Sequence, residues 1–145
     1  MINPKEIMYQ EGRRQALDLQ ERSLGLTGTE LNAEDDKIPA FREAVKVKNM
    51  LDRPVGFVCR STAGRVVRLL QPYDSSIFTQ EPEELPAQFG FVWSQDPAKA
   101  RPFVALSTSP YNTGDCCSEG GQVFRSAMDG NVWAPSAYPA GWVAV

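Results

Sequence analysis

The chain contains no histidine among its 145 residues. Catalytic pairs and triads in which a histidine accepts the proton of a serine or cysteine are therefore excluded, and so are metal sites built on imidazole. The three cysteines, Cys59, Cys116 and Cys117, are odd in number and have no C-x-x-C spacing. Because this pattern is a poor disulfide framework, we expect buried structural thiols, no metal ion and no other cofactor.

Long apolar runs and an excess of positive charge are also missing. No apolar stretch approaches the roughly 18 residues that span a bilayer, so we expect no membrane insertion. The net charge of −3 gives no reason to expect a nucleic-acid partner. The first residues lack a basic start followed by an apolar core, which predicts synthesis in the cytoplasm without a signal peptide.

The first segment, residues 1–52, is predicted to be helical and to serve in oligomerisation or attachment. Asn3 and Pro4 have the pattern of an N-cap followed by a proline at the first helical position, and Gly25 is a plausible stop. Between them, one face of a helix is predicted to carry Met8, Gly12, Ala16 and Leu19.

A second helix is predicted to start near Pro39. Its apolar side would carry Ala40, Ala44, Val47 and Leu51. Residues 45–48 also alternate like a strand, so the segment could hold one helix or two. Both stripes are narrow and must be covered, either by the rest of the chain, by further copies of it, or by a larger assembly.

The rest of the chain, rich in glycine and proline, contains an internal repeat. Alternating apolar residues before and after a turn at residues 61–64 predict a β-hairpin. The stretch 64–68 recurs 57 residues later at 121–125, and this offset also places Cys59 on Cys116. A second stretch, 82–89, recurs 53 residues later at 135–142.

The repeat predicts an α+β protein in which the helical segment is followed by two small antiparallel β modules, an internal duplication. We place the first, degenerate module at 53–100 and the second at 101–145. Modules of about 40 residues are near the lower limit of independent folding, so the two copies are expected to pack on each other or the chain to oligomerise.

The second module resembles the chitin-binding type 3 (family 5/12) carbohydrate-binding fold. The residues that carry this resemblance are Tyr111, Gly114-Asp115, a hairpin ending at Phe124, the run Asn131-Val132-Trp133-Ala134-Pro135, then Pro139 and a closing Trp142. The first module matches less well, because Phe57-Val58 stands where the second has Gly114-Asp115. The resemblance implies a three-stranded sheet with a sugar-binding face of exposed aromatic side chains.

Five residues of the second module are candidates for that face. Aromatic rings can pack on the apolar face of a pyranose, while amides and carboxylates hold its hydroxyls. The candidates are Trp133 and Tyr138, with Tyr111 behind them, and Asn131 and Asp115 as polar partners. Several have a structural alternative, since Tyr138 aligns with Leu85 and Asp115 suits a turn; Trp142 is expected in the core, and Phe124 is left open.

Similar modules behind a short helical N-terminus occur in tail and baseplate proteins of bacteriophages. This likeness implies a non-enzymatic virion component that assists host attachment by binding bacterial surface glycans. Its partners would be other tail or baseplate proteins and further copies of the chain, with a homotrimer as the first expectation. The alternative is a purely structural tail protein that has lost sugar binding.

An enzyme is the least favoured interpretation. A glycosidase needs two carboxylates at a cleft, and Asp115 with Glu119, or the acidic run at 81–84, would have to supply them. A chain of small pieces offers little room for a deep cleft. The acidic run Glu34-Asp35-Asp36 lacks the spacing of a calcium loop and is assigned to a helix start.

Overall fold

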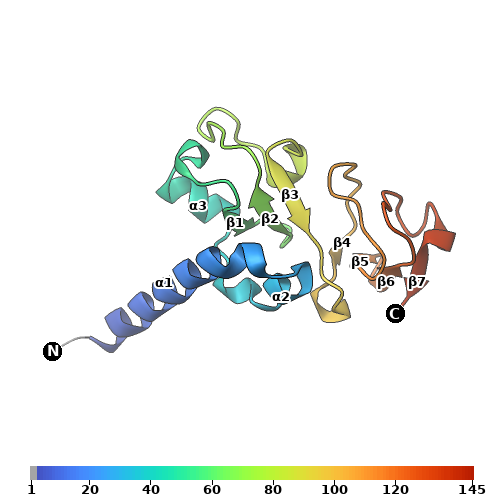
Figure 1. Ribbon diagram of the computed structural model, residues 1–145, viewed down its shortest axis with the longest axis horizontal. Coiled ribbons are helices and arrows are strands. Elements are labelled where there is room, and N and C mark those ends of the chain that lie inside the picture. Colours follow the sequence, from blue (N-terminus) through green and yellow to red (C-terminus); the bar gives the residue numbers. More distant parts are fainter. Residues whose placement is uncertain (1–2) are drawn as a thin grey trace.

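In the computed structural model, which describes residues 3–145, helices at the N-terminus are followed by two small sheets, and the α+β class is confirmed (Figure 1). The helices are α1 (Pro4–Arg22), α2 (Gly28–Ala33) and α3 (Phe41–Val47). The first sheet contains β1 (Val58–Arg60), β2 (Val66–Leu69) and β3 (Phe89–Val92). The second contains β4 (Arg101–Pro102), β5 (Cys116–Glu119), β6 (Gln122–Ser126) and β7 (Trp142–Ala144).

Helix α1 begins where the sequence predicts and leaves the body of the protein. The Asn3 side chain accepts a hydrogen bond from the backbone N–H of Lys5 at 2.9 Å, and Pro4 follows the cap. The helix runs into a 3-10 turn that ends at Gly25, the expected stop. Of the predicted apolar face, Leu19 is buried, whereas Met8 is 74% exposed. The N-terminal half of α1 projects into solvent (Figure 1).

The second helical region is confirmed as a helix, α3, but its buried side differs from the prediction. Phe41 and Ala44 are buried, while Val47 and Leu51 are exposed. The ring of Phe41 sets this orientation, because it packs edge-on against Phe89 with centroids 5.7 Å apart. Helix α2, which we did not anticipate, has a complete capping box in which Thr27 and Glu30 bond each other's backbone N–H.

The two sheets repeat one arrangement of a hairpin and an antiparallel third strand. In the first, β2 pairs with β1 and β3; in the second, β6 pairs with β5 and β7. A glycine with positive φ precedes each hairpin, Gly56 at 93° and Gly114 at 97°. Their N–H groups donate to equivalent carbonyls, Leu69 at 2.7 Å and Ser126 at 2.9 Å. Strand β4 is an addition, since it lies parallel to β5.

The cysteine alignment is corrected by the strand register. Cys59 pairs with Val67, and Cys117 pairs with Phe124. Val67 and Phe124 are equivalent in the repeat, so Cys59 corresponds to Cys117, and the alignment with Cys116 is wrong by one residue. The reason is that the second hairpin turns on two residues, Gly120 and Gly121, both with positive φ, whereas the first turn is one residue longer.

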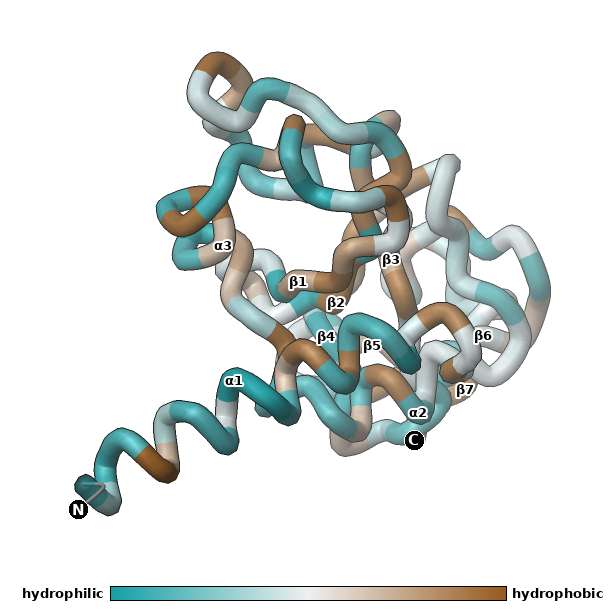
Figure 2. The backbone as a smooth tube through the Cα atoms, turned by 60° about the vertical axis from the view of Figure 1, so that its left-hand side comes forward, coloured by the Kyte–Doolittle hydropathy of each residue, from teal (hydrophilic) through white to brown (hydrophobic). Residues whose placement is uncertain are grey.

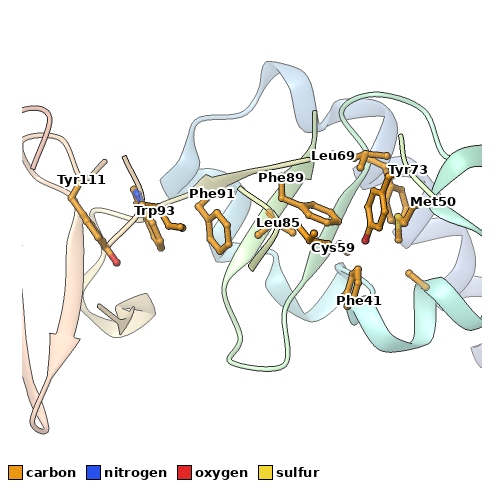
Figure 3. Packing of buried hydrophobic residues seen from close by; sticks show 14 of the residues in the cluster. Phe41, Met50, Cys59, Leu69, Tyr73, Leu85, Phe89, Phe91, Trp93 and Tyr111 are labelled. Carbon is orange, nitrogen blue, oxygen red and sulfur yellow. The ribbon is translucent and has the colours of Figure 1, made fainter. Parts of the chain in front are cut away.

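An aromatic stack joins the two modules into one hydrophobic core. Hydrophobic residues run along β1 to β3, while α1 is mostly hydrophilic (Figure 2). From this sheet the core continues through Phe91 and Trp93 to Tyr111 (Figure 3). Trp93 and Tyr111 are stacked with their ring centroids 4.2 Å apart. Phe103 also stacks on Tyr111, with their centroids 5.4 Å apart. The two modules therefore pack on each other.

Candidate functional site

Trp133 and Tyr138 lie together in the connection between β6 and β7. Their side chains are 48% and 43% exposed, and their ring centroids are 5.8 Å apart with the planes at 65°. Together with Met128 and Ala137 they line an open hollow of about 420 Å³. The structure thus brings together two of the five candidate residues at one concave surface.

The backbone of Trp133 is held in place by hydrogen bonds to buried side chains. The Trp133 N–H donates to the Asn131 side chain at 3.2 Å, and its carbonyl accepts from the Trp142 indole N–H at 2.8 Å. Tyr138 lies against Gly141, where an added Cβ would be 2.9 Å from Tyr138 Cδ2. The backbone of Trp133 and the ring of Tyr138 are therefore held in place by contacts inside the protein.

Asn131 is not a ligand contact, and that prediction is wrong. Its side chain is fully buried, and Nδ2 donates to Ser126 Oγ at 3.1 Å and to the Gly141 carbonyl at 3.0 Å. With its oxygen accepting from Trp133, both ends of the amide are used inside the protein. A buried amide must satisfy its hydrogen bonds internally, so Asn131 acts by positioning Trp133 and Gly141.

Tyr111 is also wrongly predicted as a sugar contact. Its side chain is 1% exposed and stacked on Trp93, at the centre of the aromatic stack between the modules. The hydroxyl accepts a long hydrogen bond of 3.4 Å from the Val104 N–H. Burial raises the pKa of this hydroxyl above its ordinary value. The Tyr111 ring fills the space between the cores of the two modules, and this is why it is buried.

Asp115 serves the turn that precedes β5. Its Oδ2 accepts a 2.8 Å hydrogen bond from the Asn112 N–H. Burial raises the pKa of the half-buried carboxyl, and this hydrogen bond opposes the rise. Asp115 does not line the hollow, so its assignment as a polar partner of a sugar is not supported. Its observed role is in the turn, which is the alternative given by the sequence. Trp142, as predicted, is buried in the core, and Phe124 packs partly buried against it.

Met128 and Ala137 line the hollow although neither was assigned to it from the sequence, and Glu119 is bonded to the neighbour of Ala137. Met128 forms one wall, although nothing in its local pattern distinguishes it from a loop residue. Glu119, considered above only as a catalytic carboxylate, reaches the same connection from the end of β5. Its Oε1 accepts a 2.9 Å hydrogen bond from the N–H of Ser136, the neighbour of Ala137. This contact joins residues 17 apart and leaves no local signal in the sequence.

The cysteines and the acidic run at 34–36 are engaged inside the protein. All three cysteines are free and buried, and burial raises the pKa of Cys59 and of Cys117 to about 12, which disfavours the reactive thiolates. Within residues 3–145, no group of three His, Cys, Asp or Glu side chains could hold a metal ion, and no helix could cross a membrane. The acidic run at 34–36 is used in ion pairs, among them Asp35 with Lys99 and Arg101.

Comparison with protein-family models, with curated proteins and with solved structures found no match to this chain.

Proposed function

We propose that the chain is a non-enzymatic component of a phage tail, baseplate or related particle that helps attach the virion to bacterial surface glycans. One observation carries the proposal, the exposed pair Trp133 and Tyr138 around a hollow on the module that resembles a carbohydrate-binding fold. Tryptophan and tyrosine side chains offer large apolar contact with few rotors to order, which suits the C–H face of a pyranose.

The N-terminal segment supplies the attachment to the particle or to further copies. Half of α1 lies outside the body and exposes Ile7, Met8 and Tyr9. Most of the stability of a helix in a protein comes from packing of its apolar face, so packing on another chain would stabilise the exposed half of α1. Beside α1, an apolar groove is lined by residues that include Leu17, Val47 and Phe57. We propose association through this region, with a homotrimer as the expected state, and contacts to other tail proteins.

Oligomerisation matters for the proposed function because a single shallow site binds weakly. Several copies that engage one surface raise the apparent affinity by about 10² to 10⁴ where the geometry allows it. A particle component with one such hollow in each copy would therefore bind an envelope and not a soluble monosaccharide.

A pull-down of the purified full chain on chitin, peptidoglycan and whole bacterial envelopes tests the proposal. Wild-type protein is expected to bind at least one of these surfaces, and Trp133→Ala is expected to lose binding. Phe78→Ala is the matched control, because it removes another half-exposed aromatic side chain from the first module. Equal binding by wild type and Trp133→Ala would remove the hollow from the proposal.

The second candidate is a purely structural tail or baseplate protein. The observation that favours it is the loss of both expected polar partners, since Asn131 and Asp115 are engaged inside the protein. A folded, oligomeric wild type that binds none of the three surfaces would support this candidate.

A further inference from the structure

We infer that the hollow at Trp133 and Tyr138 selects a ligand that carries an ammonium group, such as a saccharide with a free amine. The inference rests on the proposed function, because it names the chemical class that the same site would take. It does not follow from the resemblance, which is to modules that bind an N-acetylated polymer.

The first support is the arrangement of the two rings. Their planes cross at 65° with the centroids 5.8 Å apart, which is an edge-to-face contact, so the two rings do not form one flat platform. Trp133 and Tyr138 are both half-exposed and both line the hollow, and the faces of aromatic rings attract cations. Met128, the third wall, contributes a polarisable thioether to the same space.

The second support is a carboxylate bonded to the residue that precedes one wall of the hollow. Glu119 is fixed by its 2.9 Å hydrogen bond from the Ser136 N–H, one residue before Ala137 in the wall of the hollow. In the described part of the chain this carboxylate makes no ion pair, so its negative charge is not neutralised by a protein cation. A ligand cation in the hollow would be its counter-charge.

The third support is the charge balance of the whole module. From residue 103 to the last residue, the only charged side chains are Asp115, Glu119, Arg125 and Asp129. Arg125 is exposed on the face of β6 opposite to the inward-facing Ser126, and it donates to the Gln95 carbonyl at 3.4 Å. No described lysine or arginine lines the hollow. The surroundings favour a cation and disfavour phosphate or carboxylate groups of anionic glycans.

Binding measurements with defined ligands test the inference. The full chain is titrated at pH 6 with glucosamine oligomers, with N-acetylglucosamine oligomers of the same length, and with choline chloride, and Trp fluorescence and calorimetry report binding. We expect the amine oligomer to bind about tenfold more tightly than the N-acetylated one. Glu119→Gln should weaken amine binding about threefold to tenfold and leave the N-acetylated oligomer unchanged.

The variants are chosen so that misfolding cannot imitate the result. Glutamine at position 119 keeps an oxygen that can accept from the Ser136 N–H, so the connection should stay in place. Glu84→Gln is the matched control, since it removes an exposed acid from the first module. Choline binding similar to that of the amine oligomer would support the ammonium class and show that a quaternary head group suffices.

Failure of this inference is distinguishable from failure of the proposed function. Equal affinity for the two oligomers, or unchanged amine binding in Glu119→Gln, overturns the ammonium selectivity while glycan binding stands. Absence of binding to both oligomers and to bacterial envelopes by folded protein overturns both, and points to the structural candidate.

Discussion

Replacement of Tyr111 by alanine should be among the most destabilising single changes in this protein. The side chain is buried between Trp93 and Phe103, at 4.2 and 5.4 Å between ring centroids, and also meets Trp142 edge-on at 5.3 Å. Truncation of a large buried aromatic to alanine costs about 3–5 kcal/mol. Since total stabilities are typically about 5–15 kcal/mol, we expect a loss of about 4 kcal/mol, a large share of the whole.

Urea and thermal unfolding, followed by circular dichroism and Trp fluorescence, measure this loss. For a chain of this size, 1 kcal/mol corresponds to about 2–4 °C, so the melting temperature should fall by about 8–16 °C. Tyr111→Phe keeps the ring and loses only a 3.4 Å hydrogen bond, so its cost should stay within about 1 kcal/mol. Trp133→Ala, at a half-exposed ring, is the control for tryptophan removal and should melt close to the wild type.

The wild type should unfold in one transition, because the stack through Tyr111 makes the two modules share a core. A melting temperature of Tyr111→Ala within 2 °C of the wild type would refute the assignment of this residue to the core. It would also restore Tyr111 as a candidate for the surface site.

Three further predictions concern the thiols, the glycines and the contact between the modules. Burial raises the pKa of Cys59 and Cys117 to about 12, so a thiol reagent at pH 8 should not label them in the native protein and should label them in urea. These pKa values in the folded protein exceed the value of about 8.5 for an unfolded cysteine. The stability that the neutral thiols contribute is therefore complete below about pH 8.5 and falls as the pH rises toward 12. Urea unfolding midpoints should accordingly be lower at pH 10.5 than at pH 8. Gly141→Ala should displace Tyr138, which lies 2.9 Å from the added Cβ, and should weaken ligand binding. Gly12→Ala places a Cβ with no atom within 4 Å, so it should stabilise α1 by about 0.5–1 kcal/mol in a thermal melt. Arg65→Met should cost about 3 kcal/mol in urea unfolding, since the buried guanidinium donates to Glu83 at 2.8 Å and to the Pro102 carbonyl at 2.7 Å; a cost below 1 kcal/mol would contradict this role.

Much of the fold could be predicted because its signals are local. The cap at Asn3 and Pro4 depends on neighbouring residues, and the structure begins α1 there. The third strands start at equivalent positions of the repeat, Phe89 and Trp142, although no strand was predicted at either residue. Helix α2 could have been predicted too, because the Thr27–Glu30 capping box is written in four consecutive residues.

The candidate site was only partly predictable, because exposure depends on what the rest of the chain covers. Trp133 and Tyr138 were chosen for their residue types, and both are half exposed. Tyr111 has the same chemistry, yet it is buried, because Trp93 from the other module covers it. A sequence pattern cannot rank these three rings when the covering residue comes from another module.

The sequence by itself determined the class of the fold and the presence of two related hairpin modules, since periodicity, caps and turn glycines act within a few residues. Only the tertiary structure decided which polar groups remain available at the surface. The Asn131 side chain donates to Ser126 and Gly141 inside the protein. Glu119, at the end of β5, accepts from the Ser136 N–H next to the wall of the hollow. The physical reason is that buried polar groups must pair internally, and their partners are chosen by packing between segments far apart in the chain.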